Sequence, residues 1–292
     1  MKKQKVALVL SSGGARGLAH IGVIEELESR GYEISSVAGT SIGAVIGGSY
    51  AAGGLSAYKE WVLSLTKMEV FKLMDFTLSK NGLIKGEKVF EEMKKRIPEQ
   101  SIENLIIPFT ALAVDLVSKK EIVFNKGSLY EAIRASVSIP TVFIPYELEN
   151  MKLVDGGLLN PIPMRHIKRN ENDIVVAVIL NATDNTESAN IQAYTTETKL
   201  EDSAYSRFFQ KYRKIISKSQ RQKLSYFNII NTMFDIMLIQ ICQYELEVRK
   251  PDVLISLPQT LTSTFEFYRA GEIIEYGRTE AGKALDNFEK SI

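Results

Sequence analysis

The stretch Gly39-Thr40-Ser41-Ile42-Gly43 follows a short apolar run at 36–38 and precedes small and apolar residues at 44–52. This is the order of a strand, a sharp turn and a helix, the context in which a Gly-x-Ser-x-Gly sequence is informative. The turn would hold Ser41 in a strained backbone conformation that side chains at positions 39 and 43 would obstruct. Ser41 would then stand at a helix N-terminus, where the helix dipole favours negative charge. The same residues would also suit a turn that only lets a helix pack closely on a sheet.

A second glycine-rich turn, Ser11-Ser12-Gly13-Gly14-Ala15-Arg16-Gly17, lies between an apolar run at 6–10 and a helical pattern at 18–30. Such a turn directs several backbone N–H groups to one side, so it binds an anion: a phosphate, or the oxyanion of an acyl intermediate. Arg16 would add charge or support the loop. A dinucleotide site is the weaker interpretation, because Ser12 takes the first glycine position and the second strand runs into Gly39 rather than ending in an acid.

A third motif is formed by Asp155, which ends an apolar stretch at 153–154 and precedes Gly156 and Gly157. The two glycines would let another backbone or a serine side chain approach the carboxylate. An ordinary Asp-Gly hairpin turn has the same sequence, so this motif alone does not decide between the two interpretations.

Only two histidines, His20 and His166, are available as a base for a serine nucleophile. His20 lies on an apolar helical face, which indicates a packed residue. His166 follows Asp155 by 11 positions, whereas α/β-hydrolases place the acid well before a late histidine and several strands before the nucleophile. We therefore favour a direct pair of Ser41 and Asp155, with Asp155 as the base. A triad through His166 is the alternative.

The three motifs, at 11–23, 39–43 and 154–157, occur in the order and spacing of the patatin-like phospholipase family, and the chain resembles a compact bacterial member. The likeness covers 5–181 and, more loosely, 225–285. It implies an α/β fold, a three-layer α/β/α sandwich with a mainly parallel sheet, as one domain over 1–292. Ser12 departs from the family, because many members carry another glycine there.

The resemblance also implies a serine acyl hydrolase of lipid esters, of the phospholipase A or lysophospholipase type, with Ser41 as nucleophile and Asp155 as base. The N–H groups around Gly13, Gly14 and Ala15 would form the oxyanion hole, with Arg16 beside it. Five further glycines would shape the motifs: Gly17, Gly39, Gly43, Gly156 and Gly157. Two alternatives are a catalytically silent protein of the same fold that binds a lipid or a partner, and a phosphate or nucleotide binder.

Composition limits the partners and cofactors of the chain. It has 292 residues, of which 45% are apolar, so it can bury a full core. Its net charge of +1 gives no bias toward nucleic acid. A single cysteine, Cys242, excludes an intramolecular disulfide and suits a reducing compartment. The sequence contains no His-Glu-x-x-His, cysteine pair or calcium-loop pattern, so we expect a reaction without a metal or another cofactor.

The apolar run at 6–10 is too short for a secretory signal and no stretch qualifies as a transmembrane helix, so we expect a cytoplasmic protein. Residues 181–223 are predicted to be a polar and basic insertion. Within it, 207–223 has seven Lys or Arg and no acidic residue. A basic amphipathic helix there would contact the inner face of the membrane, whereas a solvated helix with a packed apolar stripe is the plainer alternative.

Strand and helix patterns alternate in the first half of the chain, which argues for a parallel sheet with helices on its faces. The stretch 55–98 is predicted to be mostly helical and to line the active-site cleft, and 226–248 to be a long core helix. Strands are predicted at 6–10, 35–38, 109–116, 121–124, 142–144, 152–154, 174–180 and 252–257, and the other helices at 17–30, 42–52, 128–136, 267–275 and 277–288.

Overall fold

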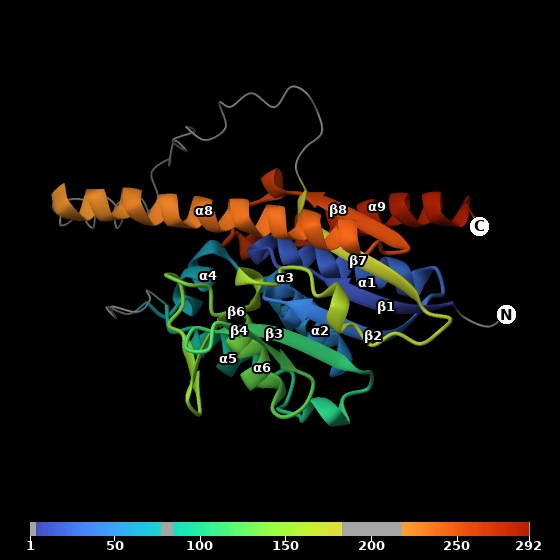
Figure 1. Ribbon diagram of the computed structural model, residues 1–292, viewed down its shortest axis with the longest axis horizontal. Coiled ribbons are helices and arrows are strands. Elements are labelled where there is room, and N and C mark those ends of the chain that lie inside the picture. Colours follow the sequence, from blue (N-terminus) through green and yellow to red (C-terminus); the bar gives the residue numbers. More distant parts are fainter. Residues whose placement is uncertain (1–3, 77–83, 183–217, 292) are drawn as a thin grey trace, which may run out of the picture. The chain divides into compact units, whose positions relative to one another are not determined.

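The computed structural model describes residues 4–76, 84–182 and 218–291 (Figure 1). The chain divides into two compact units, 1–183 with 238–292, and 184–237. All described strands belong to the first unit. The predicted basic helix at 207–217 and most of the predicted insertion lie outside the described residues, and the description of 218–223 is limited to their helical backbone. Membrane contact through 207–223 therefore stays a prediction.

A mainly parallel sheet of eight described strands forms the centre of the first unit, in the order β5-β6-β3-β2-β1-β7-β8, with β4 paired to β3. The pairs β1–β2, β1–β7, β2–β3 and β7–β8 are parallel, and β4, β5 and β6 add antiparallel pairs at one side. The strands are β1 Lys5–Leu10, β2 Glu33–Thr40, β3 Phe109–Asp115, β4 Lys120–Phe124, β5 Tyr146–Leu148, β6 Met151–Asp155, β7 Ile174–Ala182 and β8 Val253–Pro258.

The helices follow the strands in the alternating order expected for this sheet. A short 3-10 helix at Gly14–Leu18 leads into α1. The described α-helices are α1 Ala19–Ser29, α2 Ile42–Ala51, α3 Leu55–Ser64, α4 Lys67–Leu73, α5 Glu87–Lys94, α6 Leu129–Ser136, α8 Lys218–Val248 and α9 Ala270–Glu289.

Alternate residues of β1 face two different apolar layers. Leu8 and its neighbours on one face pack against α1, α2 and α9. Val9 on the other face packs with Ile162, Met164 and, from α8, Cys242. The sheet is therefore covered on both sides, which makes the three-layer α/β/α sandwich that the sequence predicted. Burial raises the pKa of the Cys242 thiol to about 12, so this cysteine is a packing residue.

Helices α1 and α9 cross in direct backbone contact on one face of the sheet. A Cβ added to Gly22 would lie 1.9 Å from the carbonyl oxygen of Ile274, and one added to Gly277 would lie 2.2 Å from that of Ala19. Only glycine permits such an approach, so these two positions set the distance between the helices.

Three of the sequence-based predictions need correction. The predicted strand at 142–144 is a turn with one bridge, from Phe143 to Ile84, because the N–H groups of Val142 and Phe143 donate back to the carbonyl oxygen of Ile139. The predicted break between two C-terminal helices is absent, since Gly277 lies inside the continuous α9 and is retained there for its contact with α1. The predicted core helix is only partly buried: Leu238 and Cys242 are inside, whereas Val248 is 73% exposed. None of the described helices is both long and apolar enough to span a membrane.

Candidate active site

Ser41 lies at the turn between β2 and α2 with φ of 57° and ψ of −124°. The two motif glycines make this turn possible. A Cβ on Gly39 would lie 2.3 Å from the carbonyl oxygen of Gly43, and a Cβ on Gly43 would lie 2.2 Å from that of Leu10. Any side chain at either position would displace the backbone, so the sequence holds Ser41 in the strained conformation that the motif predicts.

Asp155 ends β6 beside Ala113 of β3 and meets the serine directly. The Ser41 Oγ donates a hydrogen bond to Oδ2 of Asp155. The other carboxylate oxygen, Oδ1, accepts the N–H of Gly157 at 2.7 Å. A Cβ on Gly156 would lie 2.4 Å from the carbonyl oxygen of Leu112, so the turn after Asp155 also needs glycine. The structure thus brings together two residues that lie 114 positions apart.

The Asp155 carboxyl is 2% exposed, and its burial sets its acidity. Burial raises the pKa of Asp155 to about 7, although the hydrogen bonds from Ser41 and Gly157 favour the ionised form and act in the opposite direction. A base is most effective when its pKa lies near the working pH, so this carboxylate is suited to exchange a proton with Ser41 near neutrality.

The glycine-rich loop carries two backbone donors that have no partner among the described residues. Gly14 adopts a positive φ of 58° and lines the same cavity as Ser41. Within the described residues, the N–H groups of Gly13 and Gly14 donate to no other group. The Ala15 N–H, in contrast, donates to the carbonyl oxygen of Thr264 at 2.9 Å. Of the three N–H groups that the sequence predicts for an oxyanion hole, those of Gly13 and Gly14 are therefore open and that of Ala15 is already bonded.

The Arg16 guanidinium connects the glycine-rich loop to neighbouring segments. It donates to the carbonyl oxygens of Gln259 at 3.3 Å and Thr262 at 3.1 Å, and to Oδ1 of Asn181 at 2.9 Å. Of the two roles considered from the sequence, the contacts thus favour support over an added charge for an anion. Gly17 brings the loop against α2, since a Cβ there would lie 2.3 Å from the Ile42 side chain.

Both histidines have other partners. The His166 Nε2 lies 2.9 Å from Oε1 of Glu121. The buried His20 has its Nε2 3.0 Å from the Ser11 carbonyl oxygen, and burial lowers its pKa to about 4. The hydroxyl of Ser41 meets a carboxylate rather than an imidazole, so the geometry favours the direct pair over the triad.

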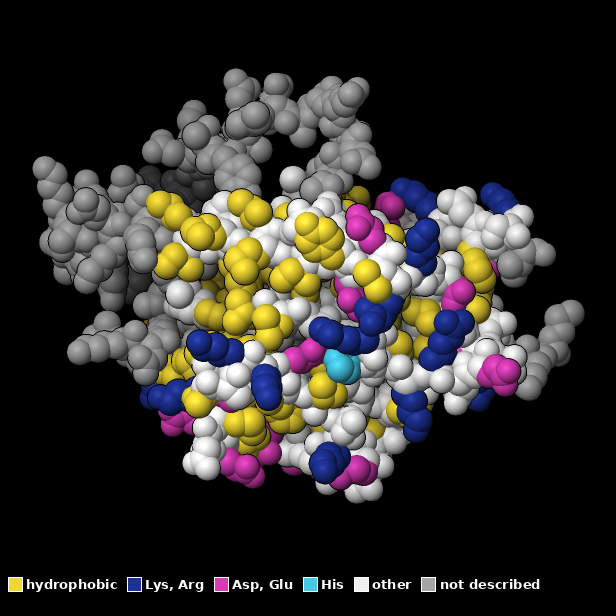
Figure 2. Space-filling model, viewed as in Figure 1, with side chains coloured by type: hydrophobic (Ala, Val, Ile, Leu, Met, Phe, Trp, Pro, Cys, Tyr) yellow, Lys and Arg dark blue, Asp and Glu magenta, His cyan; other side chains and the backbone are white. Residues whose placement is uncertain are grey.

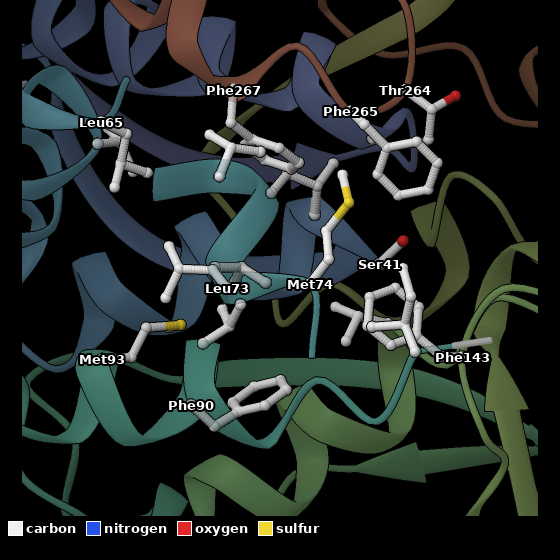
Figure 3. A pocket seen from close by; sticks show the side chains of 18 of the residues that line it. Ser41, Leu65, Leu73, Met74, Phe90, Met93, Phe143, Thr264, Phe265 and Phe267 are labelled. Atoms are coloured by element: carbon white, nitrogen blue, oxygen red, sulfur yellow. The ribbon is translucent and has the colours of Figure 1, made fainter. Parts of the chain in front are cut away.

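Ser41 opens onto an apolar cavity of about 140 Å³. Figure 3 shows Ser41 and Phe143 on one side of the cavity, with Met93 and Leu65 on the opposite side. Helices α3, α4 and α5 supply much of the wall, as the sequence predicted for 55–98. The segment 264–267 supplies another part, which the sequence had not indicated, because nothing in its local pattern relates it to the serine.

The described residues include no group of three His, Cys, Asp or Glu side chains placed to hold a metal ion. The expectation of a reaction without a metal stays a prediction. Figure 2 shows basic and acidic side chains interspersed on one face, in keeping with a net charge of +1.

Comparison with known proteins identifies the family. Residues 8–167 match the profile of the family described as patatin-like phospholipase, and this stretch contains the glycine-rich loop, Ser41 and Asp155. The chain belongs to this family. An uncharacterized NTE family protein of Mycobacterium tuberculosis is 35% identical over 98% of this chain and 92% of its own length. Patatin-like phospholipase domain-containing protein 6 of Mus musculus is 30% identical over 62% of this chain and 14% of its own length.

A solved structure, that of VipD from Legionella pneumophila, aligns with a TM-score of 0.48 and 14% identity over 99% of this chain and 67% of that chain. Membership of the patatin-like phospholipase family supports a lipid hydrolase activity on a lipid ester.

Proposed function

We propose that this member of the family is a serine acyl hydrolase that cleaves lipid esters through a dyad of Ser41 and Asp155. One observation carries the proposal: the Ser41 hydroxyl, hydrogen-bonded to a buried carboxylate, faces an apolar cavity. A hydroxyl needs a base to become a nucleophile, and the cavity fits an acyl chain. The phospholipase A or lysophospholipase type is the finer form of this proposal.

In the first half of the reaction, Asp155 takes the proton from the Ser41 Oγ as that oxygen attacks the ester carbonyl carbon. The carbonyl electron pair moves to its oxygen, where the N–H groups of Gly13 and Gly14 donate to the resulting anion. Loss of one such donor typically costs about 3–4 kcal/mol of transition-state stabilisation. When the tetrahedral intermediate collapses, the alcohol leaves with the proton from Asp155 and an acyl-enzyme remains.

In the second half, Asp155 takes a proton from water, and the hydroxide attacks the acyl carbon. Collapse of this second tetrahedral intermediate expels the Ser41 oxygen, which regains the proton, and releases the carboxylic acid. Each residue returns to its starting protonation state, so the two residues complete the cycle.

Hydrolysis of a chromogenic medium-chain ester, with a chelator present, tests the proposal. The wild type is expected to be active, whereas Ser41→Ala and Asp155→Asn are each expected to lose at least about a thousandfold in kcat, as for other members of catalytic units. Circular dichroism would establish that both variants fold. Activity that persists in Asp155→Asn would point to another base.

The silent lipid-binding protein makes a different prediction. A fluorophosphonate reacts with an activated serine, so the proposed enzyme is labelled at Ser41 and Ser41→Ala is not. A folded wild type that neither hydrolyses esters nor takes the label would contradict the proposed function.

A further inference from the structure

The C-terminal end of α6 contacts both members of the proposed dyad. The Ser136 Oγ accepts the backbone N–H of Ser41 at 2.9 Å. Two residues later, the Ser138 carbonyl oxygen accepts the backbone N–H of Asp155 at 2.9 Å. Both serines are fully buried. A single turn of chain therefore holds the nucleophile strand and the acid strand at fixed positions.

The bond to Ser41 matters because of the conformation at that residue. Ser41 has a positive φ of 57°, which a residue with a side chain adopts only where its surroundings hold it there. Its N–H is buried at the start of α2, so it needs an acceptor, and the Ser136 hydroxyl supplies one. Removing that acceptor would leave a buried donor unpaired at the most strained point of the site.

The end of α6 is itself held in place. The Arg134 Nη1 donates to the Ser138 Oγ at 2.6 Å, and its Nη2 donates to the carbonyl oxygens of Lys85 at 2.9 Å and Ile144 at 3.2 Å. These contacts tie the turn to two neighbouring segments, so the Ser136 hydroxyl has little freedom to follow a displaced Ser41.

We propose that Ser136 is a positioning residue, whose hydroxyl holds the Ser41 backbone so that the nucleophile stays aligned with Asp155. The proposal rests on the proposed function. Val137 and Ile139 line the apolar cavity that Ser41 faces, whereas Ser136 does not. Loss of its hydroxyl should therefore lower kcat and leave KM unchanged, because the error affects the approach of Oγ rather than binding of the acyl chain.

Three variants test this role. Ser136→Ala removes the acceptor, Ser136→Cys keeps the shape with a weak acceptor, and Ser49→Ala is a matched control. Ser49 is also a buried serine, on α2, and its Oγ has no partner among the described residues. Ester hydrolysis should give a kcat about tenfold to a hundredfold lower in Ser136→Ala, an intermediate value in Ser136→Cys, and a change below about twofold in Ser49→Ala.

Two further readouts separate positioning from general loss of structure. KM should stay within about twofold, and the apparent pKa of kcat should rise, because a misaligned Ser41 donates a weaker hydrogen bond to the Asp155 carboxylate and so favours its ionised form less. A kcat in Ser136→Ala within twofold of the wild type, or a loss equal to that in Ser49→Ala, would overturn the proposal.

An activity-independent measurement covers the case in which the wild type hydrolyses no ester. Amide hydrogen exchange at Ser41 should be at least about tenfold faster in Ser136→Ala than in the wild type or Ser49→Ala. Unchanged exchange contradicts the positioning role by itself. Faster exchange in an inactive protein would support the contact and reject the dyad, so the two failures are distinguishable.

Discussion

Asp155 combines two properties that oppose each other. It must ionise to serve as a base, yet it lies in an apolar interior, which favours the neutral acid. The hydrogen bonds from Ser41 and Gly157 supply part of the lost hydration, and the pKa settles near 7. The site therefore retains a proton that the unfolded chain would have released.

This retained proton makes stability depend on pH. The folded pKa of Asp155 lies above its ordinary value of 3.8, so the contribution is present at low pH and is lost as pH rises from about 4 to about 7. Asp155→Asn removes this dependence. We expect the free energy of unfolding of the variant, minus that of the wild type, to increase between pH 4 and pH 8 by up to about 4 kcal/mol, at about 1.4 kcal/mol for each pKa unit.

Urea unfolding of both proteins across this pH range measures the difference. The comparison also cancels the contribution of His20, which both proteins contain. The pKa of His20 is about 4, below its ordinary value of 6.5, so its effect on the free energy of unfolding has the opposite sign: stability falls as pH decreases through that window. A difference that stays constant with pH would mean that Asp155 ionises as an ordinary surface acid.

At the scale of elements, the units that could be predicted from the sequence are those whose signals are local. The strand, turn and helix around Ser41 follow from adjacent residues, and so does the glycine-rich loop. The bonding of the Ala15 N–H to Thr264 could not be predicted, because the two residues lie in segments about 250 positions apart. The contact of Ser136 with Ser41 was missed for the same reason. The pairing of Ser41 with Asp155 was predicted, because neither histidine suited the role of base and because the motifs resemble those of the family.

Gly277 shows how a local signal misleads. The sequence predicted that a second helix begins at this glycine, after a break at 276, yet Gly277 lies inside the continuous α9, where its missing side chain allows contact with α1. We expect Gly277→Ala to destabilise the protein by about 1–3 kcal/mol, because the new Cβ would meet the Ala19 carbonyl oxygen at 2.2 Å and force the helices apart.

Gly282→Ala is the matched control in the same helix. Its Cβ would lie 3.5 Å from the flexible end of Arg30, an ordinary contact, and alanine is favoured over glycine in a helix by about 0.5–1 kcal/mol. Urea midpoints should therefore shift in opposite directions for the two variants. Equal shifts would show that glycine at 277 is not required for the α1–α9 contact.

At the scale of the whole first unit, the sheet brings the two residues of the site together and the helices after α2 build the cavity. Its wall combines α3 to α5 with residues 137–143 and 264–267, so no single segment determines its shape. The sequence predicted the helices, but the length of the cavity depends on how they pack, and that is a property of the assembled unit.

Met93 offers a test of this arrangement, because it is buried, lines the cavity and lies on the side opposite Ser41 (Figure 3). Met93→Ala should lengthen the space for an acyl chain without touching the dyad. We expect the ratio of kcat/KM for a dodecanoyl ester to that for a butanoyl ester to rise at least about fourfold, which corresponds to the burial of one further methylene at about 0.8 kcal/mol.

Leu285→Ala is the control, since Leu285 is equally buried in α9 but is not part of the cavity. Both variants should lose about 2–5 kcal/mol of stability, and only Met93→Ala should change the ratio. If the ratio changed equally in Met93→Ala and Leu285→Ala, the change would result from loosened packing rather than from a longer cavity.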